Sequence, residues 1–311
     1  MTMKKSFALF VTVWMLLSCH SEEVPGGKAV TAHVSEITMT SALLHGSVNL
    51  SEDEASVRFG IVYSRDSKPT AENGTAVEAR ERDTDNSFHC LATGLLMDEK
   101  YYYRAYIRDN GRYRYGEVRS FSTEDFPSGG EEAVDLGLSV KWRSCNLGAA
   151  GPFEYGDYYS WGETAPKEDY SGKTYAWVRG DEFTKYNQED NKVVLDLSDD
   201  AARARLGGNW RMPTHAEFME LLGCSRTRTG RHGMEGFLFT GPSGRSIFLP
   251  AGGDRVGTNG DKGDGRGYYW SSSRPSSGAF YAWSLCLGSD YVNMRSDLGR
   301  YHGHSIRPVS E

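Results

Sequence analysis

The chain has 311 residues, and its 42 acidic and 35 basic side chains give a formal net charge of −7. Its densest basic clusters, residues 203–205 and 226–231, are short and interrupted, which is typical of solvated loops. An acidic chain without a basic patch lacks the electrostatic signature of nucleic-acid binding. We therefore expect no nucleic acid among its partners.

The N-terminus has the pattern of a secretory signal. Lys4 and Lys5 precede an apolar run, residues 7–17, that is too short to span a bilayer. The run ends in Leu-Leu-Ser-Cys, which resembles the bacterial lipobox. This resemblance implies that residues 1–18 are a lipoprotein signal peptide and that Cys19 is the lipid attachment point. Several acyl chains on one residue give durable membrane anchoring, so the membrane is an expected partner.

Residues 19–26 are expected to form a tether behind the anchor. Glu22 and Glu23 lie in this tether. Two acids so close to a lipidated cysteine resemble the export tag of lipoproteins in the Bacteroides group. That resemblance implies an outer membrane lipoprotein that is exposed at the cell surface.

The four remaining cysteines are far apart in the sequence: Cys90, Cys145, Cys224 and Cys286. No two of them form a CxxC pair or a zinc knuckle, so a thiolate metal site is not expected. In an exported protein they are either disulfide partners or small buried hydrophobic residues, and the sequence leaves both open.

Residues 27–123 have the pattern of β-strands throughout. Short alternating runs at residues 42–50 and 58–64 predict two strands, and Asn73 with Gly74 provides a turn before the later strands. Such a series of short strands predicts an all-β domain.

The end of this region shows a more specific pattern. Tyr101 follows Leu95 by six residues and begins a predicted strand at residues 101–107, and residues 115–123 fit a closing strand. This arrangement resembles a fibronectin type III domain, with Tyr101 as the tyrosine corner. The resemblance implies an immunoglobulin-like β-sandwich that serves as a spacer between the membrane and the next domain.

A second domain is predicted at residues 133–311, after a polar linker at residues 124–132. It is rich in Gly, Trp and Tyr and shows a single strong helix signal. Thr214 and Glu217 have the spacing of a capping box at the helix start. The apolar residues that follow at helical spacing are Phe218, Leu221 and Leu222.

The C-terminal segment predicts a β-hairpin. Residues 283–287 alternate between large apolar and small side chains, and residues 288–290 form a turn. Val292 and Met294 then belong to the inner face. The large apolar residues expected to form the scaffold of this segment are Trp283, Leu285, Leu287, Val292, Met294 and Ile306.

The outer face of this hairpin is the predicted binding site. It combines aromatic anchors with adaptable hydrogen-bonding groups, which is the composition of a paratope. The candidate ligand-binding residues are Ser284, Asp290, Tyr291, Asn293, Arg295, Asp297, Tyr301, His302 and His304. Two histidines facing a ligand predict binding that changes between about pH 5 and 8. The alternative is a polar edge without a ligand.

Several sequence blocks in the second domain resemble the Fibrobacter major paralogous domain family and its Bacteroides relatives. The blocks are residues 134–142, 155–164, 208–214, 246–253, 269–273 and 305–309. Residues 210–218 are also similar to a helix start in the formylglycine-generating enzyme group. These resemblances imply a mixed α/β domain of C-type-lectin-like fold, in which the N- and C-terminal strands pair.

Relatives of that fold include the variable proteins of diversity-generating retroelements, whose C-terminal segments end much as this chain does. In those proteins framework strands stay fixed while outward residues change to meet new ligands. Between residues 284 and 304 only Met294 belongs to a residue type that the mutagenesis rarely produces, and its position is on the inner face. A diversified face and a fixed binding face both remain open.

No catalytic residue, cofactor or metal is predicted. The formylglycine-generating reaction needs a late pair of cysteines, whereas Pro308 follows Arg307 and Cys286 has no neighbouring partner. A G-x-S-x-G motif is missing, and His215 with Glu217 lack zincin spacing.

The acids available for a glycosidase pair are Asp135, Asp157, Glu163 and Asp254. Residues 259–265 are interpreted as a Gly-rich loop, because their acids lack the spacing of a calcium loop.

These observations predict a surface lipoprotein whose second domain binds a glycan or a protein, and not an enzyme. A structural or pilus-associated subunit is the alternative, in which the same face would contact a neighbouring copy. A polysaccharide-acting enzyme is a third hypothesis.

Overall fold

The computed structural model describes residues 27–50, 57–126, 133–231, 233–261 and 265–311. The predicted signal peptide, Cys19, the tether and most of the linker lie outside the described residues. Within them, the strands form two groups that share no sheet. None of the helices described is long and apolar enough to cross a membrane.

The first group of strands forms a β-sandwich. Its three-stranded sheet consists of β1 (Lys28–Ser35), β2 (Ser41–Asn49) and β5 (Ser87–Thr93). Its larger sheet consists of β4 (Thr75–Glu78), β3 (Arg58–Ser64), β6 (Lys100–Asp109), β7 (Arg112–Tyr115) and β8 (Arg119–Ser122). The strands predicted at residues 42–50, 58–64 and 101–107 are confirmed. Alternate residues of both sheets, such as Leu44 and Ile61, meet in one buried core.

Tyr101 occupies the predicted tyrosine corner. Its hydroxyl oxygen accepts a hydrogen bond of 3.0 Å from the backbone N–H of Leu96. The ring is buried and stacks on Phe121 with 5.8 Å between the ring centroids. The contact ties the loop before β6 to the core of the sandwich.

The second group consists of short strands and two short helices between long connections. Its first and last strands belong to one small sheet, in which β10 (Lys141–Arg143) lies between β9 (Ala133–Val134) and β21 (Val309–Ser310). The helical elements are η1 (Leu197–Asp199), α1 (Ala201–Leu206) and α2 (His215–Leu222). The two-stranded sheets are β11 (Val178–Arg179) with β12 (Glu182–Phe183), and β16 (Asp254–Val256) with β17 (Asn259–Asp261). The pairing of β10 with β21 agrees with the implied pairing of the terminal strands.

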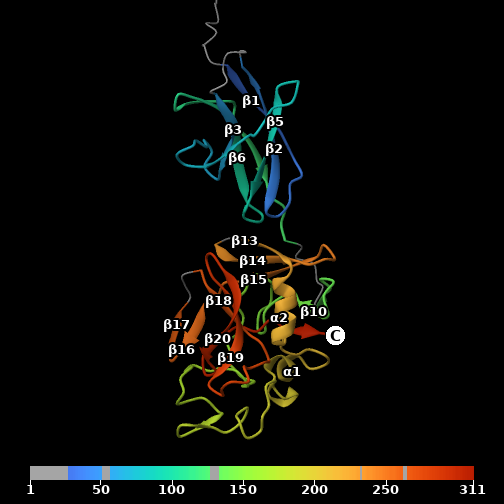
Figure 1. The fold of residues 1–311 in the computed structure, drawn as a ribbon, viewed down its shortest axis with the longest axis vertical. Coiled ribbons are helices and arrows are strands. Elements are labelled where there is room, and N and C mark those ends of the chain that lie inside the picture. The colour runs from blue at the N-terminus through green and yellow to red at the C-terminus, as the bar shows by residue number, and fades with distance from the viewer. Residues whose placement is uncertain (1–26, 51–56, 127–132, 232, 262–264) are drawn as a thin grey trace, which may run out of the picture.

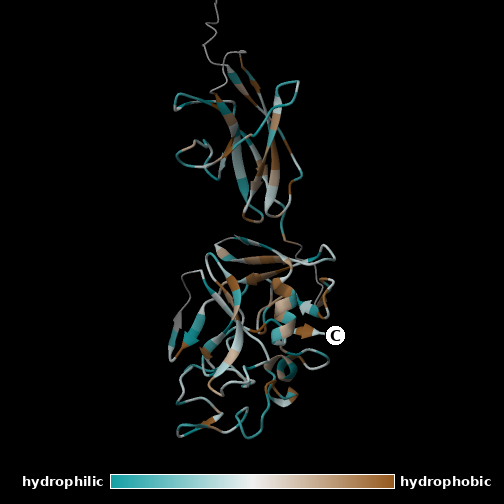
Figure 2. Cartoon of the chain, viewed as in Figure 1, coloured by the Kyte–Doolittle hydropathy of each residue, from teal (hydrophilic) through white to brown (hydrophobic). Residues whose placement is uncertain are grey.

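Two three-stranded sheets complete this second group. One is formed by β13 (Ser225–Arg231), β14 (Met234–Thr240) and β15 (Ser246–Pro250). The other is formed by β18 (Gly267–Trp270), β19 (Tyr281–Leu287) and β20 (Val292–Gly299). In Figure 2 the ribbon of β14 and β15 is largely brown, in keeping with their buried side chains, whereas β16 is largely teal.

Helix α2 begins as predicted. The Thr214 hydroxyl accepts from the Glu217 N–H, and the Glu217 carboxylate accepts from the Thr214 N–H. Phe218 and Leu221 are fully buried, and the Phe218 ring lies 5.3 Å from that of Trp142 on β10. The helix therefore joins the terminal strands to one apolar core.

Three local predictions were wrong. The basic cluster at residues 203–205 lies in helix α1, where Asp200 caps the first turn and Ala201 and Ala202 are buried. The cluster at residues 226–231 lies in strand β13, which is held by the apolar strand β14. Asn259–Asp261, interpreted as part of a loop, forms strand β17. In the two strands, pairing with a neighbouring strand outweighs the polar local composition, and in α1 the burial of Ala201 and Ala202 does so.

The sandwich and the second group of strands contact each other directly through β13. The Thr229 hydroxyl donates to the carbonyl oxygen of Leu95 over 2.7 Å, and the Met97 N–H donates to the Gly230 carbonyl over 3.0 Å. Arg231 forms an ion pair with Asp125. A small apolar cluster accompanies these bonds: Met97, Phe126, Leu238 and Phe248. The second group is therefore held against one end of the sandwich (Figure 1).

Candidate functional site

The C-terminal hairpin β19–β20 has the predicted division into two faces. Leu285 and Leu287 of β19 are buried, and Val292 and Met294 of β20 pack against the same core. Trp283 is half-buried and packs on His215 of α2, with 4.3 Å between the ring centroids. Alternation along paired strands thus fixes one face of this hairpin to helix α2 and the core.

The opposite face of β20 points away from this core. We call Tyr291, Asn293, Arg295 and Asp297 the edge face, because they alternate along the outer strand of the sheet. Tyr291, Asn293 and Asp297 are exposed, and Arg295 is half-buried. Asp290, in the turn before them, is also exposed. The predicted outward placement of these five residues is confirmed.

Two charges of the edge face are paired with each other. Arg295 donates to both carboxylate oxygens of Asp297, with 2.8 Å from its Nε to Oδ1. The hydrogen bonds from Arg295 lower the pKa of Asp297, and the same bonds raise the pKa of Arg295. Because the pair is partly exposed to water, it contributes little to stability. It presents a planar donor group and a carboxylate side by side to an approaching ligand.

Ser284 and His304 do not lie on the exposed surface, so their predicted placement was wrong. Both side chains are fully buried. The reason is that the chain after β20 crosses the outer side of the sheet: Tyr269 forms a β-bridge with Ser305, and the Trp270 N–H donates to the Ser305 carbonyl. Ser284 is covered by this crossing, and its hydroxyl contacts Nδ1 of His304 at 3.1 Å.

Burial also changes the expected pH response of the site. It lowers the pKa of His304 well below its ordinary value of 6.5, with a further contribution from His302. Burial therefore favours the neutral form of His304, and a fully buried ring does not face a ligand as the predicted pH response requires.

Tyr301 and His302 are half-buried, between the exposed edge face and the interior. The carbonyl oxygen of Tyr301 accepts from the Ser160 hydroxyl over 2.8 Å. The centroid of the Tyr301 ring lies 5.8 Å from that of Phe280 and 4.8 Å from that of His302. The structure thus places part of each ring at the surface beside β19.

Three exposed aromatic side chains lie in this hairpin segment. Phe280, Tyr281 and Tyr291 are 43%, 40% and 40% exposed, and they are the exposed Phe, Tyr and Trp side chains of the described residues. Phe280 and Tyr281 lie at the start of β19, and Tyr291 lies by the turn at its other end. The sequence interpretation did not include Phe280 and Tyr281. Their signal was the run of two aromatic residues directly before the alternating strand. Aromatic residues are enriched in binding surfaces.

A buried arginine holds the chain segment that directly precedes Phe280 and Tyr281. Arg300 is fully buried and donates to the hydroxyl of Tyr175 at 3.0 Å. Its remaining donors bind three backbone carbonyl oxygens, those of Lys185, Tyr186 and Ala279. Because Ala279 directly precedes the exposed pair of rings, Arg300 fixes the start of β19 to the distant segment around residue 186. No sequence pattern singled out this residue.

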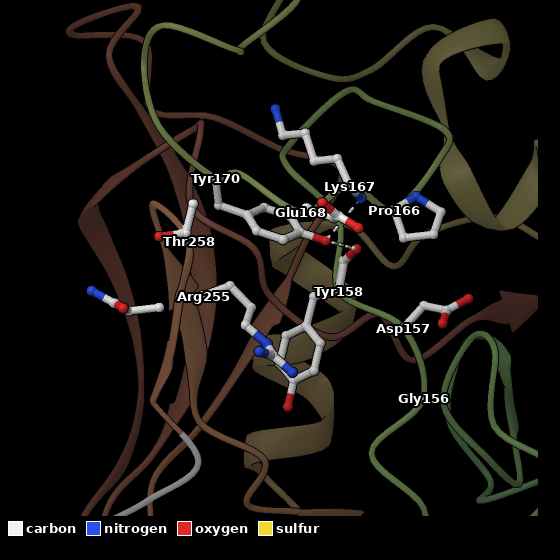
Figure 3. Close-up of a pocket in the computed structure, with 10 residues that line it drawn as sticks. Gly156, Asp157, Tyr158, Pro166, Lys167, Glu168, Tyr170, Arg255 and Thr258 are labelled. Carbon is white, nitrogen blue, oxygen red and sulfur yellow. Dashed lines mark hydrogen bonds between the residues drawn. The ribbon is translucent and has the colours of Figure 1, made fainter.

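A separate pocket of about 540 Å³ lies between β16 and the segment around residues 156–170. Figure 3 shows the Arg255 side chain beside the ring of Tyr158, and the two are 4.8 Å apart. The Tyr170 hydroxyl donates to the Tyr158 carbonyl over 2.7 Å, and burial raises the pKa of Tyr158 to about 12. Asp157 and Glu168 also line the pocket. The pocket is polar and bears charges of both signs.

The acids considered for a glycosidase have structural contacts. Glu163 pairs with Lys167 at 2.8 Å, and Asp135 accepts from the Gly137 N–H. Asp157 accepts from the Tyr159 hydroxyl. Asp254 lies 3.7 Å from Nδ1 of His302.

The four described cysteines are free and buried. Burial raises the pKa of Cys286 to about 12 and that of Cys90 to about 11. Thiols with such high pKa values are poor nucleophiles at neutral pH. These residues therefore behave as small hydrophobic groups, which was one of the two interpretations left open.

Comparisons with known proteins find similarity to solved structures only. No protein-family model and no curated protein matches the chain. The sensor domain of the anti-sigma factor RsgI4 from Pseudobacteroides cellulosolvens is 18% identical, and the match covers 33% of this chain and 99% of that domain with a TM-score of 0.28. A fibronectin type III domain from the human KIAA0970 protein is 16% identical over 33% of this chain and 84% of that one, with a TM-score of 0.23. A computationally redesigned β-sandwich protein is 18% identical over 33% of this chain and 98% of that protein, with a TM-score of 0.25.

Two of these neighbours are a β-sandwich protein and a fibronectin type III domain. At these low scores they add nothing to the assignment of the first domain as a sandwich, which comes from the pairing of β1–β8 and from the tyrosine corner.

Proposed function

We propose that the chain is a surface-anchored lipoprotein in which a fibronectin type III-like spacer presents a C-type-lectin-like domain that binds a glycan or protein ligand. The observation that carries this proposal is that the exposed Phe, Tyr and Trp side chains of the described residues all belong to the C-terminal hairpin segment, where Tyr291 lies on the edge face with charged and amide groups. Rigid aromatic rings provide contact area at low entropic cost, and the polar groups around them provide specificity.

The two faces of the hairpin support this role. The side chains that stabilise the domain, such as Leu285 and Met294, are distinct from those that would contact a ligand, such as Tyr291 and Asn293. Residues of the edge face can therefore change without loss of the core, which suits either a fixed or a diversified binding site.

The binding proposal predicts that loss of the edge face abolishes ligand capture. We expect Tyr291→Ala and Arg295→Ala each to weaken binding by about tenfold or more, because aromatic and arginine side chains dominate the energy of binding sites. The measurement is binding of the full chain to an array of bacterial and host-type oligosaccharides and to a panel of host surface proteins.

Tyr102→Ala is the matched control, since Tyr102 is a half-buried tyrosine on the sandwich. The Tyr102→Ala variant should bind the ligand as tightly as the unmodified chain does. Unchanged binding by Tyr291→Ala and Arg295→Ala would exclude the edge face as the site. Concentration-dependent self-assembly that these substitutions abolish would instead support the structural subunit.

The anchoring proposal predicts that Cys19 carries the lipid. When the full chain is expressed with labelled palmitate, we expect label in the chain and its recovery in the outer membrane fraction. Cys19→Ser should abolish the labelling and the recovery in the outer membrane fraction, whereas Ser21→Ala should leave the labelling and the recovery unchanged. Equal labelling of Cys19→Ser and the unmodified chain would rule out this attachment point.

A further inference from the structure

Asp254, His302 and His304 form a cluster that the binding proposal does not use. The Arg255 N–H donates to the Gly303 carbonyl and the Gly303 N–H donates to the Arg255 carbonyl, both over 2.9 Å. Side chains alternate along paired strands, so the residues that flank Arg255 and Gly303 point to the opposite side from them. This pairing gathers one carboxylate and two imidazoles, whose ligand atoms all lie within 4.8 Å of one another.

The cluster contains two buried nitrogen atoms without hydrogen bonds. These atoms are Nδ1 of His302 and Nε2 of His304. His304 is fully buried, and the side chains of His302 and Asp254 are 17% and 16% exposed. Buried polar atoms nearly always have a partner, and these two nitrogen atoms can each bind a ligand within the cluster.

The surroundings of His304 favour one tautomer. The Ser284 hydroxyl donates to the Tyr269 carbonyl at 3.1 Å, so its oxygen is free to accept from Nδ1–H of His304. The proton on Nδ1 leaves the lone pair of Nε2 available within the cluster. The imidazole ring is stacked on Trp270 and Tyr268, with centroid distances of 3.8 and 5.2 Å, which holds its orientation.

We propose that Asp254, His302 and His304 bind a divalent transition-metal ion, for which Zn²⁺ is the best fit. Imidazole nitrogen suits Zn²⁺, whereas Ca²⁺ and Mg²⁺ prefer oxygen ligands throughout. Around a tetrahedral Zn²⁺ the ligand atoms lie about 3.3 Å apart, as follows from Zn–N distances of about 2.0 Å. The partly exposed side chains of Asp254 and His302 have room to approach the fixed ring of His304.

The site would retain one open coordination position. Three protein ligands leave a fourth position of a tetrahedral ion for water or for a group on a bound molecule. Ser284, which orients His304, is paired in register with Arg295 of the edge face. The metal site thus lies on the same side of the sheet as the edge face, although its existence does not depend on the binding function.

The test is direct metal binding by the full chain, purified without a polyhistidine tag and treated with a chelator. Calorimetric titration with Zn²⁺ at neutral pH should show one site per chain. Asp254→Asn and His302→Ala should each weaken Zn²⁺ binding by more than about 100-fold, because loss of an outer-shell partner alone costs about 10- to 100-fold. Both residues are at the rim of the cluster, so these variants should fold, as circular dichroism would verify.

Two control variants locate the site. His45→Ala removes one of the stacked histidines of the sandwich, where the His33 and His45 rings lie 4.2 Å apart, and Asp290→Asn removes an exposed acid of the hairpin. Both should bind Zn²⁺ as the unmodified chain does. The proposal is overturned if the chain binds no Zn²⁺, if binding survives in Asp254→Asn and His302→Ala, or if it is lost in His45→Ala instead. Ligand capture is measured separately, so its failure would leave this result intact.

Discussion

Arg300→Lys is expected to destabilise the second group of strands by at least about 3 kcal/mol. The guanidinium of Arg300 is fully buried and binds one hydroxyl and three backbone carbonyl oxygens. A lysine ammonium keeps the charge but cannot reproduce the planar fork, and each buried acceptor left without a donor costs about 1–3 kcal/mol. In a domain of this size the loss corresponds to a fall of roughly 6–12 °C in melting temperature. Differential scanning calorimetry of the full chain measures this fall in melting temperature.

The control for this prediction is Arg179→Lys, since Arg179 is exposed on β11. Its melting temperature should stay within about 2 °C of that of the unmodified chain, because surface substitutions change stability little. The prediction would be contradicted by equal melting temperatures for the two variants. Arg300→Lys should also weaken ligand capture, because Arg300 holds Ala279, which directly precedes Phe280 and Tyr281.

Short-range patterns predicted the elements that depend on neighbouring residues. The alternation around residues 283–287 indicated strand β19, and the spacing of Thr214 and Glu217 indicated the start of α2. The tyrosine corner at Tyr101 was found in the same way. In each case the residues that interact lie within a few positions of one another, so their spacing contains the information.

The candidate site was only partly predictable, because the period of a strand does not reveal what covers each face. Ser284 and Asn293 both belong to the outer face of the sheet, yet Ser284 is buried and Asn293 is exposed. The difference arises from the crossing of the chain at His304, a contact between segments that are distant along the chain. Arg300 was missed for the same reason, since its partners are more than a hundred residues away in Tyr175, Lys185 and Tyr186.

Glu217→Gln is expected to destabilise the second group of strands and its helix α2 by about 2–3 kcal/mol at neutral pH. Arg211 donates to both carboxylate oxygens of Glu217, over 2.9 and 2.6 Å, and the two side chains are only 21% and 11% exposed. Glutamine retains an acceptor for the Thr214 N–H but leaves the Arg211 charge without its counter-charge. Breaking a buried pair in this way costs about 3–5 kcal/mol, and the partial exposure of Arg211 reduces the loss.

The pH dependence of this effect has a definite sign. Burial opposes the ionisation of Glu217, but the hydrogen bonds from Arg211 and Thr214 outweigh it and lower the pKa below its ordinary value of 4.5. The carboxylate therefore stabilises the fold fully above pH 4.5, and this contribution is lost as the pH falls through the lowered pKa. Urea denaturation should show a large difference in the free energy of unfolding between Glu217→Gln and the unmodified chain at pH 7. The difference should be smaller at pH 3. Glu220→Gln, on the exposed side of α2, should cost less than about 1 kcal/mol at pH 7. If Glu217→Gln lowers the free energy of unfolding equally at both pH values, the charge of Glu217 does not stabilise the helix start.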